Sequence, residues 1–195
     1  MSVSLQKGQK VSLTKAQPGL SHVVVGLGWD EAQRKRGFFS LKPAPIDCDA
    51  SAILLRDGKF VGKQDLVYFG NLRHGSGTVM HRGDNLTGAG EGDDEQIIVN
   101  LAQVPAEYDR IVFVVNIYNA VQRAQHFGMI KNAFIRIVDA NTNTEMCRYN
   151  LTEECSGMTA MIFGEIYRHQ GEWKFNAMGQ PTADTSIIEL ANRYR

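Results

Sequence analysis

The sequence predicts an all-β protein in which two sheets pack as a β-sandwich, with a few short helices including a C-terminal one. Most apolar stretches are short, rich in β-branched residues and bounded by Gly, Asn or Asp, which is typical of strands. About ten such stretches follow one another at spacings of roughly 10–15 residues, which favours a sandwich. Helical periodicity is scarce, and no longer repeat is evident.

The strands alternate with turn signals along the chain. Asp57-Gly58 and the segment 169–171 each separate two apolar runs, so each predicts a hairpin. The run 110–117 is continuously apolar from 111 to 115, which predicts a strand covered on both faces. The predicted strands are 11–13, 23–29, 52–55, 60–61, 65–69, 78–81, 96–101, 110–117, 133–138, 161–167 and 172–177.

Two segments carry helical signal. Residues 120–126 have room for about two turns, and residues 185–194 begin with Thr-Ser and continue with apolar spacing near i, i+3, i+4. The segment 31–45 is basic and then bracketed by prolines, so it is predicted to be a long loop between two strands.

The composition is that of one ordinary globular domain over residues 1–195, with 43% hydrophobic and 22% charged residues. Three cysteines without a CxxC pair favour reduced thiols. No apolar stretch has the length of a signal peptide core or a membrane span, so a cytoplasmic protein is expected. Twenty-one basic and 21 acidic residues give a net charge of +0, which provides no global field for nucleic acid.

The charge is nevertheless unevenly placed, because residues 83–96 hold five acids and no base. Glycines in this segment allow tight turns that point carbonyls inward. Like charges this close repel unless a cation lies among them, and Ca²⁺ takes ~6–8 oxygen ligands. The spacing is not that of an EF-hand, and a solvated acidic loop is the other interpretation. The candidate oxygen donors are Asp84, Asn85, Glu91, Asp93, Asp94 and Glu95.

Further oxygen donors lie at predicted strand ends. Asp30 ends one strand and Asn71 follows another, while Asp47 and Asp49 share one face of the chain just before a core strand. A sandwich gathers its loops at two ends, so such residues can converge. A single Asp or Asn more often marks a turn. The two carboxylates of Asp47 and Asp49, directly before a core strand, are destabilising unless a partner offsets their charge.

These residues belong to blocks that resemble the TerD family of tellurite-resistance and general stress proteins over nearly the whole chain. So many blocks in the same order make chance an unsatisfactory explanation. The resemblance implies a β-sandwich that binds calcium, with two ions in neighbouring sites. It also implies a role beside partner proteins of the same resistance system, some of them at the membrane. The matching blocks are 3–8, 25–30, 47–51, 83–88, 92–95, 127–136, 167–169 and 172–175.

The resemblance also implies a ligand set, with backbone carbonyls near Gly88 and Gly90 adding to the side chains. Ala89, Gly70 and Asn119 each replace a residue that offers a donor or a charge elsewhere in the family, so one of the two sites is expected to be weaker. With two Ca²⁺ bound, the chain would carry about +4. The implied side-chain ligands are Asp30, Asp47, Asp49, Asn71, Asp84, Asn85, Glu91, Asp93, Asp94 and Glu95.

The expected function is therefore a calcium-dependent interaction module of a stress response, and not a catalyst. One alternative is an enzyme that uses the acidic cluster to bind Mg²⁺ for phosphoryl transfer or nuclease chemistry, but Mg²⁺ needs only one or two carboxylates. A second alternative is a structural oligomer built through exposed sheet edges. Cys48 lies between two expected ligands, and strand alternation predicts that its thiol faces the core. The histidines show no metal-binding spacing and are expected to be structural.

Overall fold

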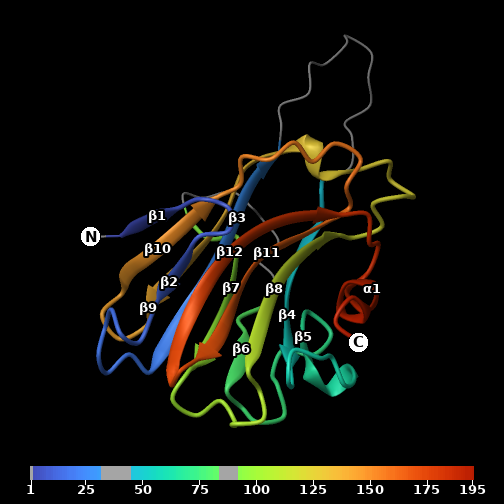
Figure 1. Ribbon diagram of the computed structural model, residues 1–195. Helices are drawn as coiled ribbons and strands as arrows, with labels where there is room; N and C mark the ends of the chain where they lie inside the picture. The colour runs from blue at the N-terminus through green and yellow to red at the C-terminus, as the bar shows by residue number, and fades with distance from the viewer. Residues whose placement is uncertain (1, 32–44, 84–91) are drawn as a thin grey trace.

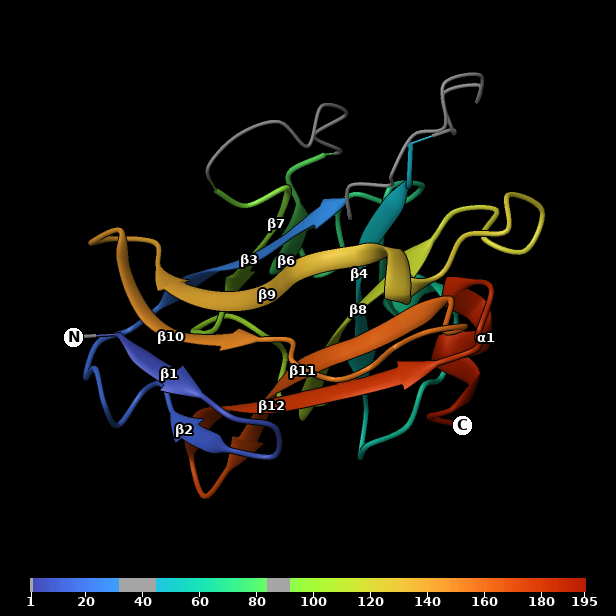
Figure 2. The ribbon, with the colours of Figure 1, turned by 90° about the horizontal axis from the view of Figure 1, so that it is seen from above.

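The computed structural model of the chain describes residues 2–31, 45–83 and 92–195. Two six-stranded sheets face each other as a sandwich (Figures 1 and 2), which confirms the predicted fold class. We call them sheet A and sheet B. Sheet A has the order β1 (Val3–Leu5), β10 (Thr144–Asn150), β9 (Ile130–Asp139), β3 (His22–Glu31), β7 (Glu95–Asn100) and β6 (Val79–His81). Sheet B has the order β2 (Lys10–Ser12), β12 (Glu172–Thr182), β11 (Ala160–His169), β8 (Arg110–Ile117), β4 (Cys48–Leu55) and β5 (Leu66–Val67).

Most strand pairs are antiparallel, and both predicted hairpin turns are present. Asp57 and Gly58 have φ values of 50° and 72°, and Gln170 and Gly171 have 52° and 78°, which are the positive angles that such two-residue turns require. Residues 60–61, predicted as a strand, are not one, because the first hairpin closes through a single bridge between Arg56 and Lys59. The sequence pattern also missed β1 and β10, which pair with each other in parallel.

Strand β8 lies inside sheet B and is buried along both faces, as its continuous apolar run predicts. Ile111, Phe113 and Val115 point into the core between the sheets. Val112 and Val114 point to the outer side of sheet B, where they pack with Leu190 of the C-terminal helix α1 (Ile187–Asn192). The helix begins after Ser186, whose hydroxyl accepts a hydrogen bond from the Glu189 N–H at 3.3 Å.

The remaining helical structure is short. The two 3-10 helices are η1 (Lys63–Asp65) and η2 (Phe127–Met129). Residues 120–126, predicted as a short helix, form turns instead, with Ala124 at a φ of 49°. In the described ranges no helix is long and apolar enough to cross a bilayer. The predicted loop 31–45 lies mostly outside the described residues.

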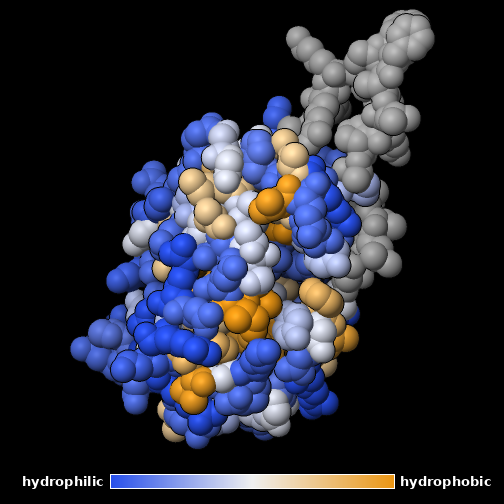
Figure 3. Space-filling view, turned by 90° about the vertical axis from the view of Figure 1, so that its right-hand side faces the viewer, coloured by the Kyte–Doolittle hydropathy of each residue, from blue (hydrophilic) through white to orange (hydrophobic). Residues whose placement is uncertain are grey.

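The outer surface is polar in general. Figure 3 shows that the right-hand side of Figure 1, which carries α1, is mostly hydrophilic with separate apolar patches. Apolar residues such as Val61 and Phe69 are exposed, and some exposed apolar surface is normal for a folded protein. The three cysteines are free, as predicted, and all three are buried.

The packing of α1 gives a first testable prediction. Leu190 is fully buried against the outer face of sheet B, so Leu190→Ala is expected to lower the free energy of unfolding by about 3 kcal/mol. Asn192→Ala, on the exposed side of the same helix, should change it by less than about 0.5 kcal/mol. Urea unfolding measures both, and equal effects would show that the helix does not cover the sheet as described.

Candidate metal centre

The acidic residues gather at one end of the sandwich, where strands of both sheets begin or end. In sheet A, β3 ends where β7 begins, because the antiparallel register pairs Leu27 with Glu95. In sheet B, β4 begins at Cys48 opposite Ile117, the last residue of β8. Glu95 joins the two sheets, since its carboxylate accepts a hydrogen bond from the N–H of Ala50. We call this region the acidic end.

Asp94 is hydrogen-bonded to the backbone of β3. Its carboxylate accepts the Trp29 N–H at 2.7 Å, and its own N–H donates to the Leu27 carbonyl at 2.8 Å. Burial raises the pKa of Asp94, the Trp29 N–H lowers it, and the charges of Asp30 and Asp93 raise it further, with a net increase. A raised pKa means that the ionised form costs stability, and this cost appears as the pH rises. A cation bound here would remove the cost.

Asp47 and Asp49 flank Cys48 at the start of β4. Asp49 is 9% exposed, and Asp47 is half-buried with Arg123 Nη1 at 3.7 Å from its carboxylate. Cys48 is buried in the core, as strand alternation predicts. Burial raises the pKa of its thiol well above the ordinary value, and the charges of Asp49, Glu95, Asp47 and Asp94 raise it further. The thiol is therefore an unreactive core group.

Asp30 lies at the exposed rim of the same end. Its carboxylate accepts a hydrogen bond from Asn132 Nδ2 at 2.8 Å, and Asn132 occupies the left-handed region with a φ of 53°. Asp94 accepts the N–H of Trp29, the residue that precedes Asp30, so the two aspartates are neighbours at this end. Asp30, Asp47, Asp49, Asp94 and Glu95 are therefore the predicted ligands that the fold brings to one end.

Asp93 lies on the opposite face of sheet A. Gln96 and Arg136 both pair with Gly26 in the register, so their side chains share the outer face. Asp93 joins them there: Arg136 Nε and Nη2 lie 2.7 and 3.0 Å from its two carboxylate oxygens, and Gln96 Nε2 donates at 2.9 Å. The Asp93 side chain is fully enclosed. Its carboxylate is thus engaged by an arginine, away from the face on which Glu95 lies.

Gly26 makes room for this ion pair and gives a second prediction. A Cβ atom at Gly26 would overlap the Asp93 carboxylate, so Gly26→Ala should lower the free energy of unfolding by about 2 kcal/mol. Gly75→Ala is the matched control, because a Cβ at Gly75 meets no atom within 4 Å and needs no unusual φ. Chemical denaturation of the two variants compares them, and similar stabilities would argue against the placement of Asp93.

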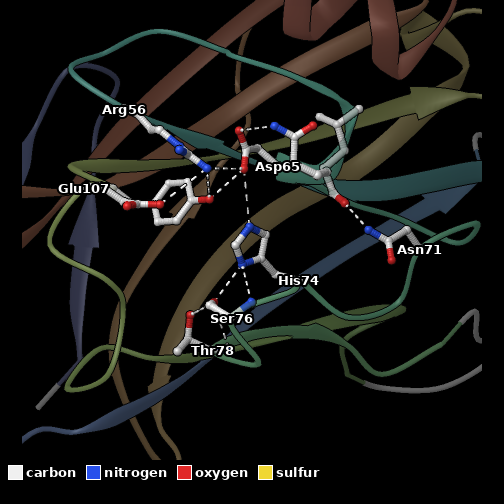
Figure 4. Close-up of polar contacts among 10 residues, drawn as sticks. Arg56, Asp65, Asn71, His74, Ser76, Thr78 and Glu107 are labelled. Carbon is white, nitrogen blue, oxygen red and sulfur yellow. Dashed lines mark hydrogen bonds and ion pairs between the residues drawn. The ribbon is translucent and has the colours of Figure 1, made fainter.

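Asn71 is not among the converging residues. Its Nδ2 donates to the Leu66 carbonyl at 2.7 Å, which directs the amide back toward β5 (Figure 4). The remaining predicted donors, Asp84, Asn85, Gly88, Gly90 and Glu91, lie outside the described residues.

Two residues of this region were not expected from the sequence. His81 is buried, with Nδ1 accepting the Gly83 N–H at 3.0 Å and Nε2 lying 3.5 Å from Glu95 Oε2 without a hydrogen bond. Arg136 supplies the charge that balances Asp93. Each is a single polar residue in a strand, and such a residue is usually expected to face solvent. The sequence therefore did not indicate that His81 lies near Glu95 or that Arg136 pairs with Asp93.

The chemistry of the converging donors fits a hard cation. Carboxylates at the ends of β3, β4 and β7 lie at the same end of the sandwich, and Ca²⁺ prefers carboxylate oxygens as ligands. Among residues 2–31, 45–83 and 92–195, no three His, Cys, Asp or Glu side chains form a group that could hold a metal ion. Binding would thus need further oxygens, and segment 84–91 leads directly into Gly92 and Asp93 at this end.

Known proteins are similar to this chain in sequence and in fold. Residues 1–194 match the TerD domain. The chain is 52% identical over 198 aligned residues to the stress response protein SCP2 of Bacillus subtilis, covering 100% of both chains. It is 51% identical to the tellurium resistance protein TerD of Serratia marcescens, covering 92% of this chain and 91% of that protein. A crystal structure of a homologue of the telluride resistance protein TerD from Streptomyces coelicolor superposes with a TM-score of 0.66 at 23% identity, covering 89% of this chain and 96% of that one. The chain therefore belongs to the TerD family.

Proposed function

We propose that this protein is a calcium-binding stress-response protein of the tellurium-resistance type, which acts as a calcium-dependent interaction module. The observation that carries the proposal is that Asp30, Asp94 and Glu95 from sheet A lie at the same end of the sandwich as Asp47 and Asp49 from sheet B. Their mutual repulsion opposes folding of this end until a cation offsets it. The names of the relatives support the cellular role, since they are tellurium resistance and stress response proteins.

In this proposal calcium fixes the relative positions of the loops at the acidic end. Glu95 already joins sheet A to Ala50 in sheet B, so an ion held by Glu95 and its neighbours would tie together both sheets and segment 84–91. Two ions are proposed, with Asp84, Asn85, Glu91 and the carbonyls of Gly88 and Gly90 completing the shells. The proposed partners are proteins of the same resistance system in the cytoplasm, some of them at the membrane. They would bind the surface that calcium orders.

The family resemblance implies that Asp93 and Asn71 are calcium ligands, but we do not assign them this role. The carboxylate of Asp93 is bound by Arg136, and the amide of Asn71 is bound to Leu66. For either side chain to bind calcium, it would first have to leave these partners. We therefore assign the main ligand role to the five converging carboxylates and to segment 84–91.

Thermal melting with and without calcium tests the proposal. An ion that binds only the folded state stabilises it by about 2.7 kcal/mol at a hundredfold excess over Kd, which would raise Tm by roughly 5–10 °C. The chelated protein with Mg²⁺ added back is the control. Equal melting temperatures in excess calcium and in chelator would contradict the proposal. Phosphatase or nuclease turnover that requires Asp94 would favour the magnesium enzyme instead.

A further inference from the structure

A second polar cluster lies at the end of the sandwich opposite the acidic end. Its centre is Asp65, the last residue of η1, which is completely buried. The Tyr108 hydroxyl donates to Asp65 Oδ1 at 2.7 Å, and Arg56 Nη2 lies 3.3 Å from the same oxygen (Figure 4). Burial and the hydrogen bond to Asp65 raise the pKa of Tyr108 to about 12, so the phenol remains a donor. Asp65 is thus held in one orientation.

His74 links this buried carboxylate to a surface serine. His74 Nε2 lies 3.5 Å from Asp65 Oδ1, and His74 Nδ1 lies 2.7 Å from Ser76 Oγ. Tyr108 packs edge-on against the imidazole, with ring centroids 5.1 Å apart. Asp65 and His74 are buried, whereas Ser76 is exposed. The order from inside to outside is carboxylate, imidazole and hydroxyl.

The hydrogen bonds assign the tautomer of His74. The backbone N–H of Ser76 donates to His74 Nδ1 at 3.1 Å, so Nδ1 carries no proton. The imidazole proton therefore resides on Nε2 and faces Asp65. Nδ1, which accepts the Ser76 N–H, also accepts the Ser76 hydroxyl, and this second hydrogen bond is the one that activates a serine. The Thr78 hydroxyl lies 2.7 Å from Ser76 Oγ and can donate to it while that oxygen donates to His74.

The serine opens into a hollow large enough for a small molecule. The hollow has a volume of about 520 Å³, and its lining includes Gln64, Asn71, Arg73 and Pro105. The Arg73 guanidinium lies against Gly77, next to Ser76, and forms no ion pair within the described part of the chain. A positive charge beside the serine would stabilise an oxyanion that forms there.

We propose that Ser76 is a nucleophile for acyl transfer from small carboxylic esters, with His74 as its general base and Asp65 as the residue that positions His74. Ser76 Oγ attacks the ester carbonyl carbon and its proton passes to His74 Nδ1. The imidazolium is stabilised by Asp65. His74 then gives the proton to the departing alkoxide, which leaves as the alcohol. Water then attacks the acyl-serine while His74 Nδ1 takes one of its protons. The bond between the acyl carbon and Ser76 Oγ breaks, His74 returns that proton to Ser76 Oγ, and the carboxylic acid leaves.

This inference does not rest on the proposed calcium function, because the two regions lie at opposite ends of the strands. Strand β4 begins with Cys48 and Asp49 at the acidic end, and its last residue Leu55 leads into Arg56 of the second cluster. Metal chelation therefore distinguishes them. The ester chemistry should persist in chelator, whatever the outcome of the calcium experiments.

A fluorophosphonate probe tests the reactive serine directly. The full-length protein is incubated with the probe in chelator, and the adduct is located by mass spectrometry. We expect phosphonylation of Ser76, loss of the adduct in Ser76→Ala, and a labelling rate at least 100-fold lower in His74→Gln. Hydrolysis of p-nitrophenyl acetate should fall in parallel. Ser156→Ala is the matched control, since Ser156 is an exposed serine whose hydroxyl donates to Glu154 instead of an imidazole.

Thermal melting of each variant shows whether it is folded. No adduct at Ser76 in the folded wild-type protein would overturn the proposal. It would also be overturned if the labelling rate were unchanged in a folded His74→Gln variant, because the hydroxyl would then react without the imidazole. A labelling rate that rises with pH in the wild-type protein, and no longer does so in His74→Gln, is the further result expected of a general base.

Discussion

Arg136→Gln is expected to lower the free energy of unfolding by about 3 kcal/mol, the largest effect of any polar substitution at this end. The reason is that the Asp93 side chain is fully enclosed and Arg136 supplies both of its charged hydrogen bonds. Without the arginine, a carboxylate would remain buried with Gln96 as its only donor among the described residues, and an uncompensated buried charge is strongly destabilising. The hydrogen bond to Asp93 raises the pKa of Arg136, so the guanidinium is charged at any pH used. Urea unfolding monitored by tryptophan fluorescence gives the value.

Glu145→Gln is the matched control for this variant. Glu145 also pairs with Arg136, at 3.3 Å from Nη1, but it lies on the open side of the arginine. Removing a partly exposed partner should cost less than about 1 kcal/mol. Asp93→Asn in the Arg136→Gln background should recover part of the lost stability, because the buried charge is then gone. If Arg136→Gln and Glu145→Gln have equal effects, Asp93 is not enclosed as described.

Asp94→Asn should weaken calcium binding at least tenfold, which reduces stabilisation by saturating calcium by about 1.4 kcal/mol. In chelator the same variant should be as stable as the wild-type protein or more stable. The raised pKa of Asp94 means that its charge opposes folding at neutral pH, and an asparagine oxygen can still accept the Trp29 N–H. Denaturant unfolding in chelator and in calcium separates the two effects.

Asp109→Asn provides the control for Asp94→Asn. Asp109 lies at the other end of the sandwich, where its carboxylate accepts the Gly58 N–H at 3.0 Å. This variant should leave calcium affinity unchanged, and any change in stability should be the same in both buffers, because an asparagine oxygen can still accept the Gly58 N–H. If Asp94→Asn instead destabilises the chelated protein and binds calcium normally, Asp94 is a structural carboxylate and not a ligand.

Much of the fold could be predicted from local patterns. The continuous apolar run of β8 indicated burial on both faces, and Asp57-Gly58 indicated a tight hairpin, because these signals depend on neighbouring residues alone. Strand β1 was missed because it has only three residues and pairs with β10 from the opposite part of the chain. Strand β10 was missed because its sequence, TEMCRYN, is mostly polar and lacks an apolar run. The segment 120–126 has helical composition, but its turns are held by contacts such as the Gln125 N–H to the Ala120 carbonyl.

The sequence predicted the composition of the acidic end better than its geometry. It identified the carboxylates that converge, yet it could not show that Asp93 faces away from Glu95. Strict alternation would place residues two apart on the same face, but Asp93 precedes β7, where Gly92 has a φ of 156° and the alternation does not hold. A shift of one residue reverses the face of a side chain. The pairing of Asp93 with Arg136 depends on the neighbouring strand, which no local pattern reveals.

Equilibrium dialysis of the chelator-stripped protein measures calcium binding at the acidic end most directly. We predict saturable uptake of about two ions, with a Kd of about 10⁻⁵ M or lower. Asp94→Asn should shift the binding curve to higher calcium, while Asp109→Asn should leave it in place. Absence of saturable uptake at calcium concentrations up to about 1 mM, in protein shown to be folded, would contradict calcium binding at this end.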